Sequence, residues 1–283
     1  MDMMRSYLTE GTEETVTGGS FGAEVETQFA REDGRPIGKD ALRGIVGEDL
    51  PKVFFRPVTY DLGRQNIEIR IDPQPRMSLL VEAIREGLGW LYEKMRNVGA
   101  YPIFAPMPFL NFSGQLLLLD DPRDQIWLEI DGASALEKLA RTSSFQLHVS
   151  INPGDAIEIV NSLWGVGVHE WDFPNDALWK QYIQDSEFPY NTDRYGGPEG
   201  FCDLAEYCSR LHEHNVVMHI GQVCNRPVRE ICPDPDLFLR SVWWHYRLRR
   251  FGATMTVEIR PIARRSDEAN IQTCLEIVAQ LGL

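Results

Sequence analysis

Phe21-Gly-Ala-Glu-Val-Glu26 alternates small or apolar residues with acidic ones. In a strand, residues two apart point to the same face, so Glu24 and Glu26 share one face and Ala23 and Val25 the other. Three later stretches repeat this design: Asn66-Ile-Glu-Ile-Arg-Ile71, Phe145-Gln-Leu-His-Val-Ser-Ile151 and Thr254-Met-Thr-Val-Glu-Ile-Arg260. The sequence therefore predicts four strands that each have an apolar back and a chemically rich front.

The fronts of these strands carry an unusual set of side chains. They comprise Glu24 and Glu26; Asn66, Glu68 and Arg70; Gln146, His148 and Ser150; and Thr256, Glu258 and Arg260. A solvated outer face is the usual explanation for a polar front on an antiparallel sheet. However, these fronts have no lysine, and two carboxylates 4 Å apart repel by about 4 kcal/mol at an effective dielectric constant near 20. Bound hard divalent cations relieve that repulsion, so we favour a magnesium site over a solvated face.

The two front-face arginines narrow the chemistry further. Arg70 and Arg260 each stand two residues from a glutamate, and the planar guanidinium group suits phosphate or carboxylate. Magnesium carboxylates beside arginine indicate a site for a nucleoside triphosphate and a carboxylate substrate. The chain has neither the phosphate-loop motif nor the glycine fingerprint of a dinucleotide-binding fold, so neither of those binding modes is available.

The rest of the chain indicates a single mixed domain. The expected strands are 20–29, 52–59, 65–71, 100–104, 125–130, 144–152, 216–220 and 253–261, and the expected helices are 78–97, 132–140, 155–164, 200–213, 236–249 and 267–281. Their order is not a regular strand–helix alternation, which favours an α+β fold with a mostly antiparallel sheet. We expect residues 1–18 to be a frayed or disordered N-terminus, 19–283 one catalytic domain, and 188–200 a long functional loop.

Composition limits the partners. Lys and Arg number 28 against 42 Asp and Glu, a formal net charge of −14, which argues against nucleic acid or an anionic membrane surface. No apolar run is long enough to cross a membrane, and the N-terminal residues lack the apolar core of a signal peptide. The five cysteines form no C-x-x-C pair, which predicts a reduced, cytoplasmic protein without disulfides or zinc. The oligomeric state stays open, a homo-oligomer included.

Taken together, these motifs resemble the glutamate–cysteine ligase and carboxylate–amine ligase superfamily. The resemblance is carried, in order, by Gly22-Ala-Glu-Val-Glu26, by Asp61 and Glu68 seven residues apart, by Gln146-Leu-His-Val-Ser150 and by Val257-Glu-Ile-Arg260. It implies a glutamine-synthetase-like antiparallel sheet that forms a funnel, with helices on its outer apolar face. It also implies a reaction in which ATP phosphorylates an amino acid carboxylate and an amine then attacks the acyl phosphate to give an amide.

The resemblance also implies roles for individual residues. It assigns Mg²⁺ ligation, with about two or three ions and Mn²⁺ as an alternative metal, to Glu24, Glu26, Asp61, Glu68, His148 and Glu258. Catalysis falls to Arg260, at the transferred phosphoryl group, and to Glu258. We assign substrate binding to Arg70, Gln146 and Ser150 from their places on the polar strand fronts, and the resemblance adds Arg194 through likeness to a substrate-loop arginine. The family's aspartate soon after the E-x-R motif is absent here, which leaves the acceptor amine open.

Other patterns have plainer explanations that we prefer. His212, His214 and His219 could converge on a transition metal, but a solvent-facing helix end that leads into a strand is the better explanation of their spacing, because no further ligand is evident. Trp243, Trp244 and Tyr246 could stack on adenine, but we expect core packing. Two rival functions also remain: an ATP-dependent kinase of a small carboxylate or guanidino substrate, and a non-catalytic homologue that only binds its ligand.

Overall fold

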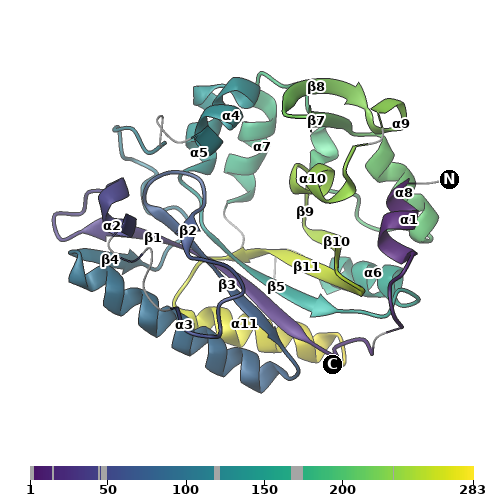
Figure 1. Ribbon diagram of the computed structural model, residues 1–283, viewed down its shortest axis with the longest axis horizontal. Coiled ribbons are helices and arrows are strands. Elements are labelled where there is room, and N and C mark those ends of the chain that lie inside the picture. The colour runs from purple at the N-terminus through teal and green to yellow at the C-terminus, as the bar shows by residue number, and fades with distance from the viewer. Residues whose placement is uncertain are drawn as a thin grey trace.

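The computed structural model describes residues 3–14, 16–43, 45, 50–117, 122–166, 175–231 and 233–283. Its centre is a curled antiparallel sheet of seven strands within these residues, with the order β10-β11-β5-β1-β3-β2 and β4 paired to the far end of β1 (Figure 1). The strands are β1 (Phe21–Arg31), β2 (Thr59–Tyr60), β3 (Asn66–Gln74), β4 (Ala100–Ile103), β5 (Ser144–Ser150), β10 (Tyr246–Phe251) and β11 (Thr254–Ala263). The α+β class and the antiparallel funnel predicted from sequence are confirmed.

Apolar residues on the back of the sheet build the main core. Val25, Ile69, Leu147, Val257 and Ile259 are at most 1% exposed. Two long helices, α3 (Met77–Asn97) and α11 (Asp267–Gln280), lie along this back face (Figure 1). The inward face of α3 repeats apolar residues at helical spacing, namely Leu80, Ile84, Leu88 and Leu91. The predicted apolar back of the sheet is therefore where the core sits.

Two irregularities bend the sheet around its front. The register of β1 against β3 shifts between Phe21 and Ala23, and that of β11 against β5 shifts between Ile259 and Ile262. Pro261 lies in the second shift, where a residue without an N–H fits the interrupted ladder. Such bulges increase local twist and bend a strand, so the front becomes concave.

A second layer faces the concave front. It contains α4 (Pro122–Asp131), α5 (Ala133–Leu139), α7 (Asp176–Asp185), α8 (Leu204–His212), α9 (Val228–Ile231) and α10 (Pro235–Arg240), the short strands β6 (Tyr195–Gly196) and β9 (Trp243–Trp244), and the hairpin of β7 (Asn215–His219) and β8 (Gln222–Pro227). In Figure 1 these elements lie above the sheet, opposite α3 and α11. Helix α6 (Ala156–Val166) follows β5, and the short α2 (Lys39–Arg43) follows β1. No helix in the described part of the chain combines the length and apolarity needed to span a bilayer.

Three expectations about local structure were wrong. Residues 125–130 were expected to form a strand but lie in helix α4. The prediction failed because the apolar residues of so short a run fit the spacing of a helix and of a strand alike. The expected helix 236–249 ends at Arg240, and β9 and β10 follow it. The expected strand 52–59 is reduced to a single bridge at Phe54 and the start of β2.

The structure has a short helix near the N-terminus. Helix α1 (Met3–Thr9) lies within the segment 1–18 that we expect to be frayed. Met4 and Leu8, four residues apart, share one face of this helix and are both fully buried. This apolar pair anchors α1 against α8, α10 and β10.

Candidate active site

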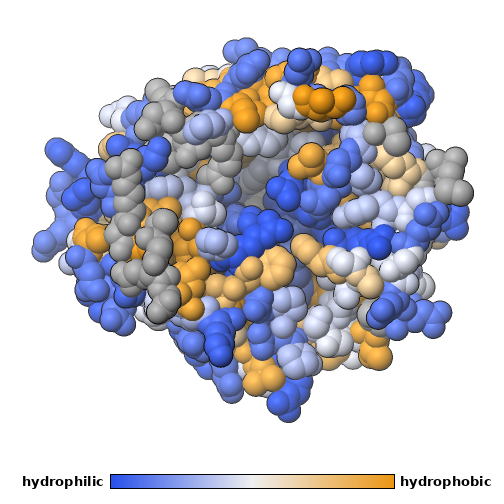
Figure 2. Space-filling view, in the orientation of Figure 1, coloured by the Kyte–Doolittle hydropathy of each residue, from blue (hydrophilic) through white to orange (hydrophobic). Residues whose placement is uncertain are grey.

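The fronts of the sheet strands line one cavity of about 470 Å³. Ten of the sequence-predicted site residues lie on its wall: Glu24, Glu26, Asp61, Glu68, Arg70, Gln146, His148, Ser150, Glu258 and Arg260. Figure 2 shows a hollow at the centre of this face of the molecule, between the sheet below and the helices above. Its size falls in the range typical of ligand pockets. Ten of the eleven residues predicted for the site therefore share one cavity, and Arg194 is the exception.

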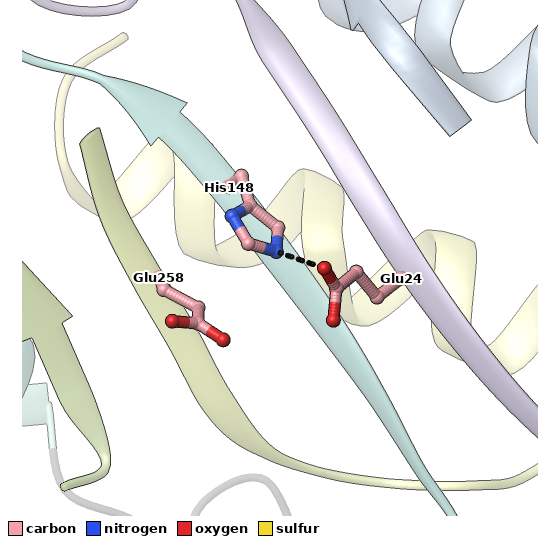
Figure 3. A group of neighbouring side chains, drawn as sticks. All are labelled: Glu24, His148 and Glu258. Atoms are coloured by element: carbon pink, nitrogen blue, oxygen red, sulfur yellow. Dashed lines mark ion pairs between the residues drawn. The ribbon is translucent and has the colours of Figure 1, made fainter. Parts of the chain in front are cut away.

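Three of these residues converge from three adjacent strands. Glu24 on β1, His148 on β5 and Glu258 on β11 each offer one ligand atom, and these atoms all lie within 4.8 Å of one another (Figure 3). The sheet register explains the convergence, because His148 lies directly opposite Glu258 on one side and Gly22 on the other, two residues before Glu24. Nε2 of His148 is 3.8 Å from Oε1 of Glu24 and is buried without a hydrogen-bond partner among the described residues.

An acidic group extends from this triad toward β3. Glu26 on β1 and Glu68 on β3 are directly opposite one another. Asp61 comes directly after β2, the edge strand that pairs with β3. Burial raises the pKa of Glu26 to about 8, with the charge of Asp61 adding to the effect. Burial also raises the pKa of Glu68 well above its ordinary value, with help from Glu24 and Asp61. Buried carboxyls that resist ionisation together form a site that favours a cation.

Arg70 is the cation closest to this acidic group. Its Nε donates to Oε1 of Glu24 at 3.0 Å, and its Nη2 forms an ion pair with Glu68. The Arg70 guanidinium thus holds two of the predicted metal ligands in place. The same guanidinium is partly exposed toward the cavity, where it can also reach a ligand.

The other end of the cavity is built around Glu258. This carboxylate is 2% exposed; Arg247 donates to it from Nε at 2.8 Å and from Nη2 at 2.9 Å, and Arg260 Nη1 donates at 2.6 Å. Burial by itself raises the pKa of Glu258, but Arg247 and Arg260 hold it well below its ordinary range. Glu258 is therefore ionised at neutral pH.

Gln146 connects the two ends of the cavity. Its Oε1 accepts from Arg260 Nη1 at 2.9 Å, and its Nε2 donates to Oε1 of Glu26 at 3.2 Å. Ser150, which lies beyond His148 on the same face of β5, accepts at Oγ from the backbone N–H of Ser20 at 2.7 Å. Arg260, the residue that the resemblance assigns to the transferred phosphoryl group, is thus held by the carboxylate of Glu258 and the amide of Gln146.

Sequence analysis missed the contribution of β10. Arg247 and Arg249 line the cavity from this strand, where a helix had been predicted. Tyr246-Arg-Leu-Arg249 alternates with period two, and Tyr246 and Leu248 are buried on the apolar back while the arginines face the cavity. That alternation was the available signal, but helical spacing of the preceding apolar residues obscured it.

An aromatic wall faces the charged floor. It consists of Trp127 on α4, Trp179 and Tyr182 on α7, Tyr195 on β6 and Trp243 on β9. Trp179 and Tyr195 are stacked at 5.2 Å, and Trp243 packs edge-on against Tyr182 at 5.4 Å. The expectation that Trp243 and Trp244 pack in the core from a helix is half right: Trp244 does, from β9, whereas Trp243 also lines the cavity.

Arg194 does not line the cavity, although the sequence predicted it to bind substrate. It is 1% exposed, and its guanidinium donates to the carbonyl and hydroxyl of Ser241 and to the carbonyl of Asn215. It also lies over the rings of Tyr190 and Phe238. These contacts tie the 188–200 segment to β7 and to the end of α10, which is a structural role.

We expect Arg194→Met to lower the free energy of unfolding by about 3 kcal/mol, because buried acceptors would lose their donors. The Michaelis constants of a substrate-turnover assay should stay within about twofold, since the residue lies outside the cavity. Denaturant unfolding and steady-state kinetics measure the two effects. A raised Michaelis constant at unchanged stability would instead restore the substrate-binding role.

The three histidines 212, 214 and 219 do not form a metal site. Among the described residues, the one group of three or more His, Cys, Asp or Glu side chains with a metal-binding arrangement is Glu24, His148 and Glu258. His214 is fully buried and its ring packs against Trp244 at 5.8 Å. Helix α8 ends at His212 and strand β7 begins at Asn215, which is the helix end leading into a strand that the sequence predicted.

Known proteins with this fold are found by structure and not by sequence. No family model and no curated protein matches the sequence. A bifunctional glutathione synthetase from Pasteurella multocida matches 94% of this chain, with a TM-score of 0.55 and 13% identity; the chain spans 39% of that protein's length. A glutamate–cysteine ligase from Francisella tularensis, solved in complex with AMP, matches 93% of this chain and 68% of its own, with a TM-score of 0.51 and 10% identity. The resemblance seen in the sequence motifs is thus confirmed at the level of fold: this chain has the architecture of those two carboxylate–amine ligases.

Proposed function

We propose that this chain is an ATP- and Mg²⁺-dependent ligase that forms an amide between an amino acid carboxylate, with glutamate as the first candidate, and an amine. ATP and the acid give ADP and an acyl phosphate, and the amine then displaces phosphate. The observation that carries the proposal is the convergence of Glu24, His148 and Glu258 in a cavity that also holds Arg260.

The donor set fits a hard divalent cation. Carboxylate oxygens are the preferred ligands of Mg²⁺, and a neutral imidazole extends the set to Mn²⁺. Burial lowers the pKa of His148, so its ring is neutral and its unpartnered Nε2 is available as a ligand. We assign Glu24, His148 and Glu258 to one ion, and Glu26, Asp61 and Glu68 to the acidic group that holds the others. When bound, such ions neutralise triphosphate charge and polarise the phosphoryl group.

The remaining residues of the site fit phosphoryl transfer. Arg260 is fixed by Glu258 and Gln146, which holds a guanidinium on the wall of the cavity. A preorganised cation at that point stabilises charge that develops on the transferred group. Gln146, Ser150 and Arg70 supply amide, hydroxyl and guanidinium groups that suit an amino acid substrate. The AMP bound to the Francisella ligase supports a nucleotide as one occupant of this fold.

The proposal is tested by measuring ADP and phosphate release with ATP, Mg²⁺ and a panel of amino acids, with and without amines. Amine-dependent amide formation, detected by mass spectrometry, is the expected result. A phosphorylated product that persists without amine would identify the rival kinase. No turnover with any pair would favour the non-catalytic homologue.

Metal removal is expected to abolish that turnover. The triphosphate and the carboxylate cluster both carry negative charge, and they repel one another without divalent ions. We expect EDTA to eliminate ADP formation, and Mg²⁺ or Mn²⁺ to restore it after the chelator is removed. Full activity in EDTA would contradict the metal assignment, and monovalent salt of equal ionic strength is the control.

A further inference from the structure

His245 lies where the aromatic wall meets the charged floor of the cavity. It stands between β9 and β10, lines the cavity and is 5% exposed. Its backbone carbonyl accepts from the N–H of Arg260 at 3.0 Å, and its own N–H donates to the carbonyl of Gly196 at 2.9 Å. The backbone of His245 is therefore fixed beside that of Arg260, the residue that we assign to the transferred phosphoryl group.

The carboxylate of Asp176 lies next to the imidazole of His245. Nε2 of His245 is 4.0 Å from Oδ1 of Asp176, at the N-terminus of α7, while Lys180 holds the other carboxylate oxygen at 2.5 Å. The ring edge of Tyr195 packs against His245 at 5.0 Å, and Trp164 at 5.7 Å. Gly196 lies beside the ring, where a Cβ would stand at an ordinary contact distance of 3.6 Å from Nε2, and its φ of +83° is what favours glycine here.

The surroundings keep this imidazole neutral until it receives a proton. Burial lowers the pKa of His245 to about 4; Asp176 acts against that effect, and Arg260 and Lys180 add to it. At neutral pH the ring is therefore neutral and able to accept a proton, and the negative charge of an acyl phosphate bound in the cavity would raise its pKa toward the range in which a general base works. The carboxylate of Asp176 then stabilises the imidazolium that results, as in other imidazole–carboxylate pairs.

We propose that His245 is the general base for the amine substrate, with Asp176 as its positioning residue. This inference rests on the proposed ligase function. An alkylammonium ion gives one proton to His245 and becomes a free amine. Its nitrogen attacks the carbonyl carbon of the acyl phosphate, the C–N bond forms and the C–O bond to phosphate breaks. The second proton leaves with the phosphate as hydrogen phosphate, so the products are amide, hydrogen phosphate and protonated His245.

Two nucleophiles separate this role from a structural one. Hydroxylamine is uncharged at neutral pH and attacks acyl phosphates without a base, whereas an alkylammonium substrate must first be deprotonated. We expect His245→Gln to lower the ratio of amide to hydroxamate formation by about 100-fold, within the range usual for loss of a general base. Because both rates come from one protein sample, partial unfolding cancels in the ratio.

His214→Gln is the matched control, since His214 is also buried with its pKa lowered by burial but does not line the cavity. Its ratio should equal that of the unchanged protein. Asp176→Asn should move the acid limb of the pH–rate profile for amide formation to lower pH, because His245 loses a charge that raises its pKa. A purely structural Asp176 would leave that limb in place.

The outcomes are distinguishable. If the unchanged protein forms amide and hydroxamate, and His245→Gln reduces both equally or neither, the assignment of His245 is wrong and the ligase function stands. If the unchanged protein forms neither product with ATP and Mg²⁺, the proposed function fails and this inference fails with it.

Discussion

Replacing Glu258 by glutamine should reduce turnover by about a thousandfold, comparable to loss of a key electrostatic group from other active sites. It should also lower the free energy of unfolding by about 3 to 5 kcal/mol, because Arg247 and Arg260 lose their buried counter-charge. Glu258 is 2% exposed and receives three hydrogen bonds from these two arginines. Initial rates and urea unfolding curves measure the two effects.

A double-mutant cycle with Arg247→Met separates the two roles of Glu258. Each single change leaves one charge buried and unbalanced, whereas the double change removes the bidentate pair. The double variant should therefore be less destabilised than the sum of the single changes. Activity should stay absent, because the metal-binding carboxylate is still missing. If activity returned together with stability, Glu258 would be only a structural anchor.

The site was largely predictable because the information lies in strand parity. Glu24, Glu68, His148 and Glu258 each sit between apolar neighbours that must face the core, so their own direction follows from the pleat. The order of the strands in the sheet was not predictable from parity. The observed register supplies it, placing β1 between β5 and β3 and His148 directly against Glu258.

The sequence-based predictions failed where the local sequence pattern fits two kinds of structure, or where tertiary contacts decide the role of a residue. Residues 236–249 begin as a helix capped by Asp234, whose side chain accepts from the N–H of Leu237. Apolar residues at helical spacing continue past the end of this helix at Arg240, which is why a longer helix was predicted. The strand beyond it exists because Tyr246 and Leu248 pair with the edge of β11. Arg194 was assigned to substrate binding through likeness to a substrate-loop arginine, yet its burial against Ser241 and Asn215 is a tertiary outcome that no local pattern encodes.

Replacing Glu24 by glutamine tests the metal site with little cost to the fold. Glu24 is partly exposed, and its Arg70 partner keeps Glu68, so no buried charge is left alone. We expect Mn²⁺ affinity to fall by at least about 10- to 100-fold, the loss seen when even an outer partner of a metal ligand is removed. Calorimetric titration with Mn²⁺ in the presence of a non-hydrolysable ATP analogue measures it.

Glu137→Gln is the matched control, because Glu137 also pairs with an arginine, Arg141, but lies on α5 outside the cavity. It should bind Mn²⁺ like the unchanged protein. Glu24→Gln should also lose turnover, in part recoverable at high Mg²⁺, because weaker affinity is offset by mass action. Unchanged Mn²⁺ affinity in Glu24→Gln would mean that the carboxylates of β1 and β11 and the imidazole of β5 converge without binding an ion. The floor of the cavity would then be an arginine-neutralised surface, and Arg70, Arg247 and Arg260 would become the principal substrate contacts.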